Sequence, residues 1–267
     1  MRIWGAALLF GLAACQQQPR VVGSTFDGAL TTNKALQVRH GERLTRVLGC
    51  TGCHGGQLQG EQFEPEKTQY GALYASNLTV AVRGYSDAQL DGILRRGVHP
   101  QRKTVWVMPS EIFQHLSEAD AKALIVYLRS LRPIGRALPP PSFNALDRSE
   151  IASGKFRPAV SLVKEDRDAL PADVGAEYAL GRYITEVTCS ECHGPRLEGK
   201  QGRTPDLVVA SGYSRAEFER LITQGIPTGN RTLKPMMAGV AKYRFSHLTS
   251  HERDALYAYL KARAERP

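Results

Sequence analysis

Two short runs of the sequence place a pair of cysteines and a histidine at the same spacing. Residues 50–54 read Cys-Thr-Gly-Cys-His, and residues 189–193 read Cys-Ser-Glu-Cys-His. In such a run each thiol can form a thioether to one edge of a porphyrin, and the adjacent histidine falls beneath the ring, where it can ligate iron. The spacing therefore predicts two covalently bound haem c groups. The attachment and proximal-ligand residues would be Cys50, Cys53 and His54, and Cys189, Cys192 and His193.

Three other classes of cysteine site explain the two runs less well. A zinc knuckle needs four ligands, and each run supplies three. A thioredoxin-like dithiol needs a strand before the first cysteine, whereas a helical pattern precedes both runs. A structural disulfide requires no histidine after the second cysteine, and here that histidine occurs twice.

The fifth cysteine, Cys15, ends a pattern of another kind. One positive charge precedes an apolar run over 3–10, which is the layout of a secretory signal. Residues 12–15 read Leu-Ala-Ala-Cys and resemble the lipobox of bacterial lipoproteins, whose cysteine is acylated after cleavage. A free or disulfide-bonded Cys15 is the alternative, but the haem sites use the other four cysteines. We therefore expect a signal peptide over 1–14, a lipid anchor and tether over 15–35, and a periplasmic protein anchored to a bacterial membrane.

The composition argues against several other functions. The 267 residues carry a formal charge of +9, but no basic run or aromatic ladder of the kind that binds nucleic acid. We therefore expect a solvated basic surface and no nucleic-acid partner. The sequence contains no stretch of 18 or more apolar residues, so it predicts no membrane-spanning helix. No Ser/His/Asp set, paired carboxylates or phosphate loop indicates independent catalysis.

The elements that must hold the two runs occur in the same order twice. A helical pattern leads into each run, over about 36–49 and 180–187. Capped helix starts then follow at 86–89 and 117–120 in the first half, and at 214–217 and 249–252 in the second. The last helices also match, since Ala-Leu-Ile-Val-Tyr-Leu at 123–128 corresponds to Ala-Leu-Tyr-Ala-Tyr-Leu at 255–260. One all-α domain is therefore used twice.

The order helix, Cys-x-x-Cys-His, loop, helix, methionine loop and terminal helix resembles class I cytochrome c domains. Residues 244–249 (Arg-Phe-Ser-His-Leu-Thr) and 76–79 (Ser-Asn-Leu-Thr) are similar to the haem-bearing cytochrome subunits of bacterial membrane-associated dehydrogenases. Those subunits often carry three haems, whereas this chain has two motifs. The resemblance implies an all-α protein of two tandem cytochrome c domains, 36–133 and 176–267. A connector over 134–175, with three consecutive prolines, would join them.

The resemblance also implies the sixth iron ligands. In class I domains this ligand is a methionine, whose soft thioether stabilises ferrous iron. Met108 is the only methionine of the first domain and precedes its last helix, with His99 as a rival in the same loop. In the second domain Met236 and Met237 compete, and Met237 fits the family phrase of methionine, two residues, then Val-Ala. The implied iron ligands are His54, Met108, His193 and Met237.

Two further features follow from the resemblance. A ligating histidine usually donates its second N–H to a backbone carbonyl. In this family the carbonyl belongs to a proline, which Pro205 matches, and Ser76 stands at the comparable place in the first domain. The family also packs its first and last helices tightly. The residues at those crossings would be Gly41 with Tyr127 and Gly181 with Tyr259.

These features favour an electron carrier over an enzyme. The predicted function is electron transfer from a periplasmic or membrane dehydrogenase to a respiratory acceptor, either a terminal oxidase or another cytochrome. The alternatives are a dihaem enzyme of the peroxidase or thiosulfate dehydrogenase type and a haem gas sensor. A peroxidase or a sensor needs an open iron position, and some thiosulfate enzymes use a cysteine ligand. Here each domain supplies a methionine, and the one spare cysteine is Cys15.

The lipobox predicts how the protein is retained at the membrane. Cys15→Ser removes the thiol that would be acylated, and several acyl chains on one residue anchor a protein far more firmly than one. We expect the variant to move from the membrane fraction to the soluble fraction with unchanged haem content. A variant that stays on membranes after a salt wash would refute lipid anchoring at this residue.

Overall fold

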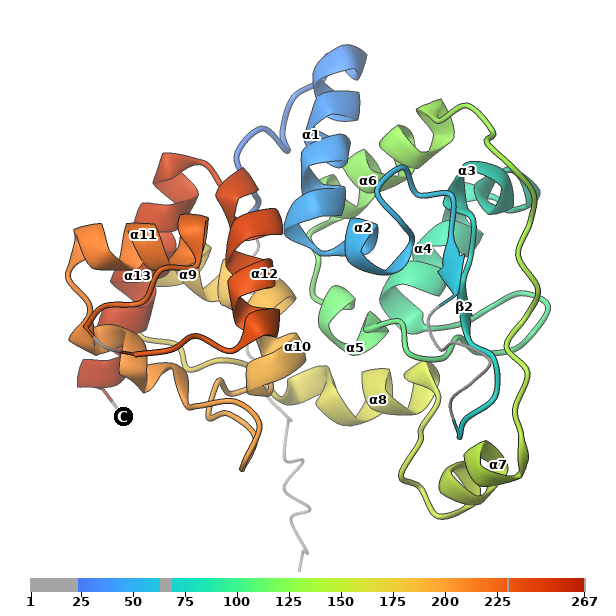
Figure 1. Cartoon of the computed structure of the whole chain (residues 1–267). Coiled ribbons are helices and arrows are strands. Elements are labelled where there is room, and N and C mark those ends of the chain that lie inside the picture. Colours follow the sequence, from blue (N-terminus) through green and yellow to red (C-terminus); the bar gives the residue numbers. More distant parts are fainter. Residues whose placement is uncertain (1–23, 63–68, 230, 267) are drawn as a thin grey trace, which may run out of the picture.

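The chain forms two helical domains side by side in a computed structural model that describes residues 24–62, 69–229 and 231–266 (Figure 1). The first domain contains α1 (Lys34–Val47), α2 (Cys50–Cys53), α3 (Leu78–Ala81), η1 (Val82–Gly84), α4 (Asp87–Arg96), α5 (Ser110–Phe113) and α6 (Glu118–Ser130), with a short antiparallel pair, β1 (Glu61–Gln62) and β2 (Tyr74–Ala75). The second contains η3 (Ala176–Tyr178), α9 (Ala179–Ile184), the π-turn η4 (Thr185–Cys189), α10 (Ser190–His193), η5 (Leu207–Gly212), α11 (Arg215–Gln224), α12 (Pro235–Tyr243), η6 (Phe245–His247) and α13 (Ser250–Glu265). The expected all-α fold with two tandem domains is confirmed.

Local capping sets the start and end of the helices that frame each site. The expected capping boxes open α4 at Ser86, α11 at Ser214 and α13 at Thr249. Gly97 and Gly225 end α4 and α11 with φ of +64° and +71°, a conformation that glycine adopts without steric cost. Ser117 also caps α6, but its backbone N–H donates to the Tyr183 hydroxyl of the other domain and not to the Asp120 carboxylate, so that capping box is incomplete.

The first and last helices of each domain cross at the expected glycines. A Cβ added at Gly41 would lie 2.1 Å from the carbonyl oxygen of Ala123 and 2.6 Å from the Tyr127 Cβ. In the second domain, a Cβ at Gly181 would lie 2.1 Å from the Ala255 oxygen. Such distances are far inside van der Waals contact, so α1 on α6 and α9 on α13 can approach this closely only because the glycines have no side chain. The predicted crossings are confirmed.

Each domain contributes one side chain, at corresponding positions of its first helix, that contacts the other domain. Two residues after the crossing glycine of α1, Arg43 reaches the other domain and pairs with Glu252 at 2.7 and 2.9 Å. Two residues after the crossing glycine of α9, Tyr183 donates a hydrogen bond to Asp120 at 2.7 Å. Both carboxylates occupy the third position of the last helix of their domain and are fully buried. Each first helix therefore contacts the last helix of the opposite domain.

The amino-terminal segment lies between the domains. The sequence predicts a tether over 15–35, but Phe26 is fully buried against the ring of Tyr183, with centroids 5.4 Å apart. The backbone N–H of Phe26 donates to Asp120, and that of Asp27 donates to Glu252. The tether prediction is therefore wrong from residue 24 onward, because the single aromatic ring finds an apolar site that only the assembled domains create. The predicted signal peptide and Cys15 lie outside the described residues.

The connector lies along the first domain. The amide of Asn77 donates to the Ile134 carbonyl at 2.7 Å, and Trp106 packs edge-on against Phe143 with ring centroids 5.0 Å apart. The sequence predicts only a proline-containing connector here, and the structure shows that it includes α7 (Ala145–Ala152), α8 (Ala159–Glu165) and η2 (Asp166–Asp168). These helices are too short to show a recognisable hydrophobic period. Within residues 24–62, 69–229 and 231–266, no helix combines the length and apolar content needed to cross a bilayer.

The helix crossings predict a steep cost for one added methyl group. Gly41→Ala should lower the free energy of unfolding by about 2 kcal/mol or more, because its Cβ would overlap backbone that cannot move aside. Gly92→Ala in α4 is the matched control, since its Cβ would meet only the flexible end of Arg96 and alanine favours helix. Chemical denaturation should find the control within about 1 kcal/mol of wild type. Equal stability of the two variants would contradict close packing at the crossing.

Candidate functional site

Both Cys-x-x-Cys-His runs lie where the first helix of a domain ends. In the first domain α1 ends, Gly49 adopts φ of +80°, and the single turn α2 then carries the two cysteines. In the second domain the π-turn η4 continues α9 directly into α10, which ends at His193. The helix crossings described above thus position both runs relative to the last helices.

The two histidines are oriented by backbone carbonyls. The His54 Nδ1 lies 2.7 Å from the Ser76 carbonyl oxygen, and the His193 Nδ1 lies 2.8 Å from that of Pro205. Because a carbonyl only accepts, Nδ1 must donate, and Nε2 is left without a proton as an iron ligand requires. The predicted bond to Pro205 is confirmed, and Ser76 supplies the same bond in the first domain.

The four thiols of the runs are free, with Cys189 buried and the other three partly buried. None of them forms a disulfide. Burial raises the pKa of Cys50 to about 12 and that of Cys189 to about 11. A free thiol at these two positions stays protonated, with the Thr188 Oγ1 lying 3.5 Å from the Cys189 Sγ, whereas a thioether is apolar and suits the same buried surroundings. The donor set and its environment therefore fit two covalently attached haems.

The candidate sixth ligands differ in exposure. Met108 and Met237 are partly buried and pack against the hydrophobic core, whereas Met236 is 75% exposed. His99 is buried, but its Nδ1 accepts hydrogen bonds from two backbone N–H groups, and its Nε2 lies 3.2 Å from the Tyr85 hydroxyl. Both ring nitrogens are engaged, which favours Met108 over His99. Ligation by Met108 and Met237 stays a prediction.

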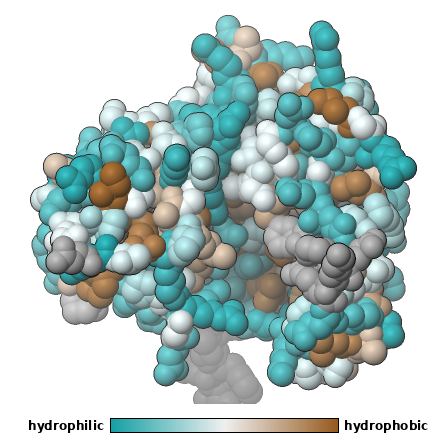
Figure 2. All heavy atoms as spheres, in the orientation of Figure 1, coloured by the Kyte–Doolittle hydropathy of each residue, from teal (hydrophilic) through white to brown (hydrophobic). Residues whose placement is uncertain are grey.

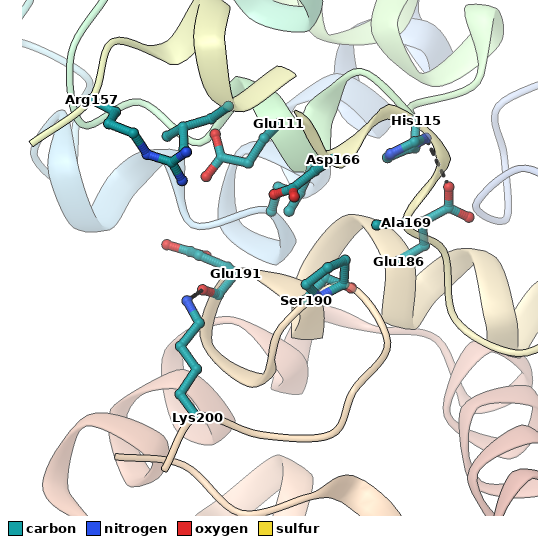
Figure 3. A pocket seen from close by; sticks show the side chains of 12 residues that line it. Glu111, His115, Arg157, Asp166, Ala169, Glu186, Ser190, Glu191 and Lys200 are labelled. Carbon is teal, nitrogen blue, oxygen red and sulfur yellow. Dashed lines mark hydrogen bonds and ion pairs between the residues drawn. The ribbon is translucent and has the colours of Figure 1, made fainter. Parts of the chain in front are cut away.

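A cavity of about 300 Å³ separates the two domains near the runs, and Figure 2 shows this face hollowed where α5, α8 and α10 meet. Charged side chains from both domains and the connector line it, as Figure 3 shows: Glu111, His115, Asp166, Glu186, Glu191 and Lys200. The His115 ring pairs with Glu186 across the domain boundary at 3.0 Å. One carboxylate oxygen of Glu111 is buried without a hydrogen-bond partner among the described residues.

Sequence reasoning missed two charged residues at the site. Arg244, which follows α12, donates to the Val47 carbonyl in the first domain and pairs with Glu191 at 2.9 Å. Glu191 is one of the two unspecified positions of the second run. The only sequence signal for Arg244 was its place in the phrase at 244–249, and a single charged position cannot predict a contact with a residue almost 200 positions away.

Comparison with known proteins agrees with this geometry. A family model for cytochrome c matches residues 38–132 and 178–264. A dihaem c-type cytochrome of Cereibacter sphaeroides is 25% identical over 257 residues, covering 84% of this chain and 85% of that protein. Two segments with complete motifs thus bind two covalent haem c groups.

Two matches are subunits of larger assemblies. The cytochrome c subunit of gluconate 2-dehydrogenase from Pantoea cypripedii is 29% identical over 194 residues, covering 66% of this chain and 42% of that subunit. The CcoP subunit of a cbb3-type cytochrome c oxidase from Helicobacter pylori is 30% identical over 104 residues, covering 39% of this chain and 31% of that subunit. The first of these two relatives agrees with the resemblance to dehydrogenase subunits.

The cavity predicts a pH-dependent stability. Burial raises the pKa of Glu111, and Asp166 and Glu191 raise it further, while its own backbone N–H and Lys200 act in the opposite direction. Because the folded state holds this pKa above the unfolded value, ionisation of Glu111 destabilises the fold as the pH rises through that interval. Glu111→Gln should therefore be more stable than wild type by about 1 kcal/mol at pH 8, with the gain disappearing at or below about pH 4.

Thermal unfolding of the haem-loaded protein at several pH values measures this effect. Glu118→Gln is the matched control, because the Glu118 side chain is 87% exposed and its substitution should give no such gain. A stability difference for Glu111→Gln that does not vary with pH would show that its charge is already compensated.

Proposed function

The chain belongs to the cytochrome c family, and on that premise we propose that it carries electrons from a periplasmic or membrane dehydrogenase to a respiratory acceptor. The main observation behind this proposal is the pair of complete attachment runs, in each of which a backbone carbonyl accepts a hydrogen bond from the histidine. The relatives support redox partners of this kind, since one is a subunit of a dehydrogenase and another a subunit of an oxidase.

The protein's residues set the properties of the bound groups. Haem c supplies reversible one-electron chemistry when bound. His54 and His193 would ligate iron through Nε2, with ring orientation fixed by the hydrogen bonds at Nδ1. Met108 and Met237 would supply thioethers that favour the ferrous state and leave no open position for a substrate. Their packing against the hydrophobic core holds them in place.

We also propose that the protein is exported and attached to the membrane by lipid at Cys15. The support is the amino-terminal pattern, in which the apolar run ends in the lipobox-like residues 12–15. Haem attachment outside the cytoplasm and redox partners at a membrane would both suit this location.

Methionine ligation distinguishes a carrier from an enzyme or sensor. Met108→Ala and Met237→Ala should each open one iron while the thioethers keep its haem attached. Each variant should then bind carbon monoxide stoichiometrically at that haem, and the potential of that haem should fall. Met236→Ala is the control, because Met236 is 75% exposed. Carbon monoxide difference spectra measure the outcome.

Wild-type protein and the Met236→Ala control should not bind carbon monoxide. Rapid stoichiometric binding by wild type would mean that one iron is already open, and the dihaem enzyme or the gas sensor would replace the carrier. Binding by Met236→Ala alone would instead identify Met236 as the ligand of the second domain.

A further inference from the structure

One guanidinium contacts the segments that hold both haem-attachment runs. Arg244 belongs to the second domain, and its Nε donates to the Val47 carbonyl at the end of α1 at 3.1 Å. A Cβ added at Gly49 would lie 2.8 Å from the Arg244 Cζ, so the guanidinium packs against the residue directly before Cys50. Its Nη1 pairs at 2.9 Å with Glu191, which lies inside the second run. The Arg244 side chain is only 14% exposed.

The position of this group places its charge beside both runs. Its Nε contacts the end of α1 just before the first run, and its Nη1 contacts a residue inside the second run. The guanidinium therefore lies between the two runs.

The Arg244 hydrogen bonds are incomplete without a further group. Its Nη2 is buried and has no hydrogen-bond partner among the described residues. An unsatisfied donor on a charged group is unfavourable when buried, so the loaded protein is expected to supply an acceptor there. Simple cross-linking of the domains does not explain Arg244, because Arg43 already pairs with Glu252 at the same interface.

We propose that Arg244 is a positioning residue shared by both haems, which fixes the two attachment edges against one another and places a single buried positive charge beside both. This inference rests on the proposed electron-carrier function and specifies how the two redox centres are tuned. A reduced haem carries one more negative charge than an oxidised haem, so a nearby cation raises the potential. In this enclosed position, solvent ions screen the charge only weakly. Glu191, its partner, acts with the opposite sign.

The test is a potentiometric titration of both haems, followed by optical spectra. At a fixed ambient potential, Arg244→Gln should lower the ratio of reduced to oxidised haem by about tenfold at each haem, which corresponds to about 59 mV. Arg244→Lys keeps the charge and should restore most of this ratio. Arg43→Gln is the matched control, because it removes another ion pair between the domains and should leave both potentials unchanged.

Glu191→Gln provides an independent variant of opposite sign. It removes the carboxylate that pairs with Arg244 inside the second run and should raise the potentials of both haems. If Arg244→Gln fails to retain its haems, Glu191→Gln tests the proposal alone. A higher potential at both haems in Glu191→Gln supports the shared charge, and unchanged potentials overturn it. A shift at only one haem, or an equal shift in Arg43→Gln, also overturns it.

The failure of this inference can be distinguished from failure of the proposed function. Electron exchange between wild-type protein and a dehydrogenase is measured separately from the potentials. Normal exchange with unchanged potentials in Arg244→Gln would refute the shared charge and leave the carrier function in place. No exchange by wild type, with both potentials shifted as expected, would refute the carrier function alone.

Discussion

The geometry of each domain depends on a contact between two helix backbones. At Gly41 and Gly181 the opposing carbonyl oxygens lie where a Cβ would otherwise be. This contact fixes the axis of the first helix against the last, and so determines where the first helix ends and the attachment run begins. The same crossing directs the residues two positions later, Arg43 and Tyr183, toward the other domain. Cofactor attachment and domain association therefore follow from one constraint.

Features encoded by local sequence could be predicted. The Cys-x-x-Cys-His runs and the capping boxes lie within short segments whose chemistry is specific, whereas the glycine crossings were implied by the resemblance to cytochrome c domains. The carbonyl partner of His193 could be predicted because the resemblance implies a proline carbonyl, which Pro205 matches twelve residues after the histidine. Ligation by Met108 and Met237 stays a prediction, although the exposure of Met236 agrees with the choice.

Features created by domain association could not be predicted. Phe26 is buried and packs against Tyr183 of the second domain, and no periodicity in a ten-residue segment indicates such a partner. Arg244 and Glu111 look like ordinary surface charges in the sequence. Their environments arise from contacts with residues far away in the chain, which a single sequence does not reveal.

The docked connector affects how the two redox centres respond to dilution. Residues 134–168 run along the first domain, so little free chain separates it from the second. The association of the domains is therefore intramolecular, with an effective concentration in the millimolar range or above. Two separate single-haem proteins with the same contacts would dissociate at low abundance. In this chain the two centres remain in a one-to-one ratio and at a fixed separation, however few copies the cell makes.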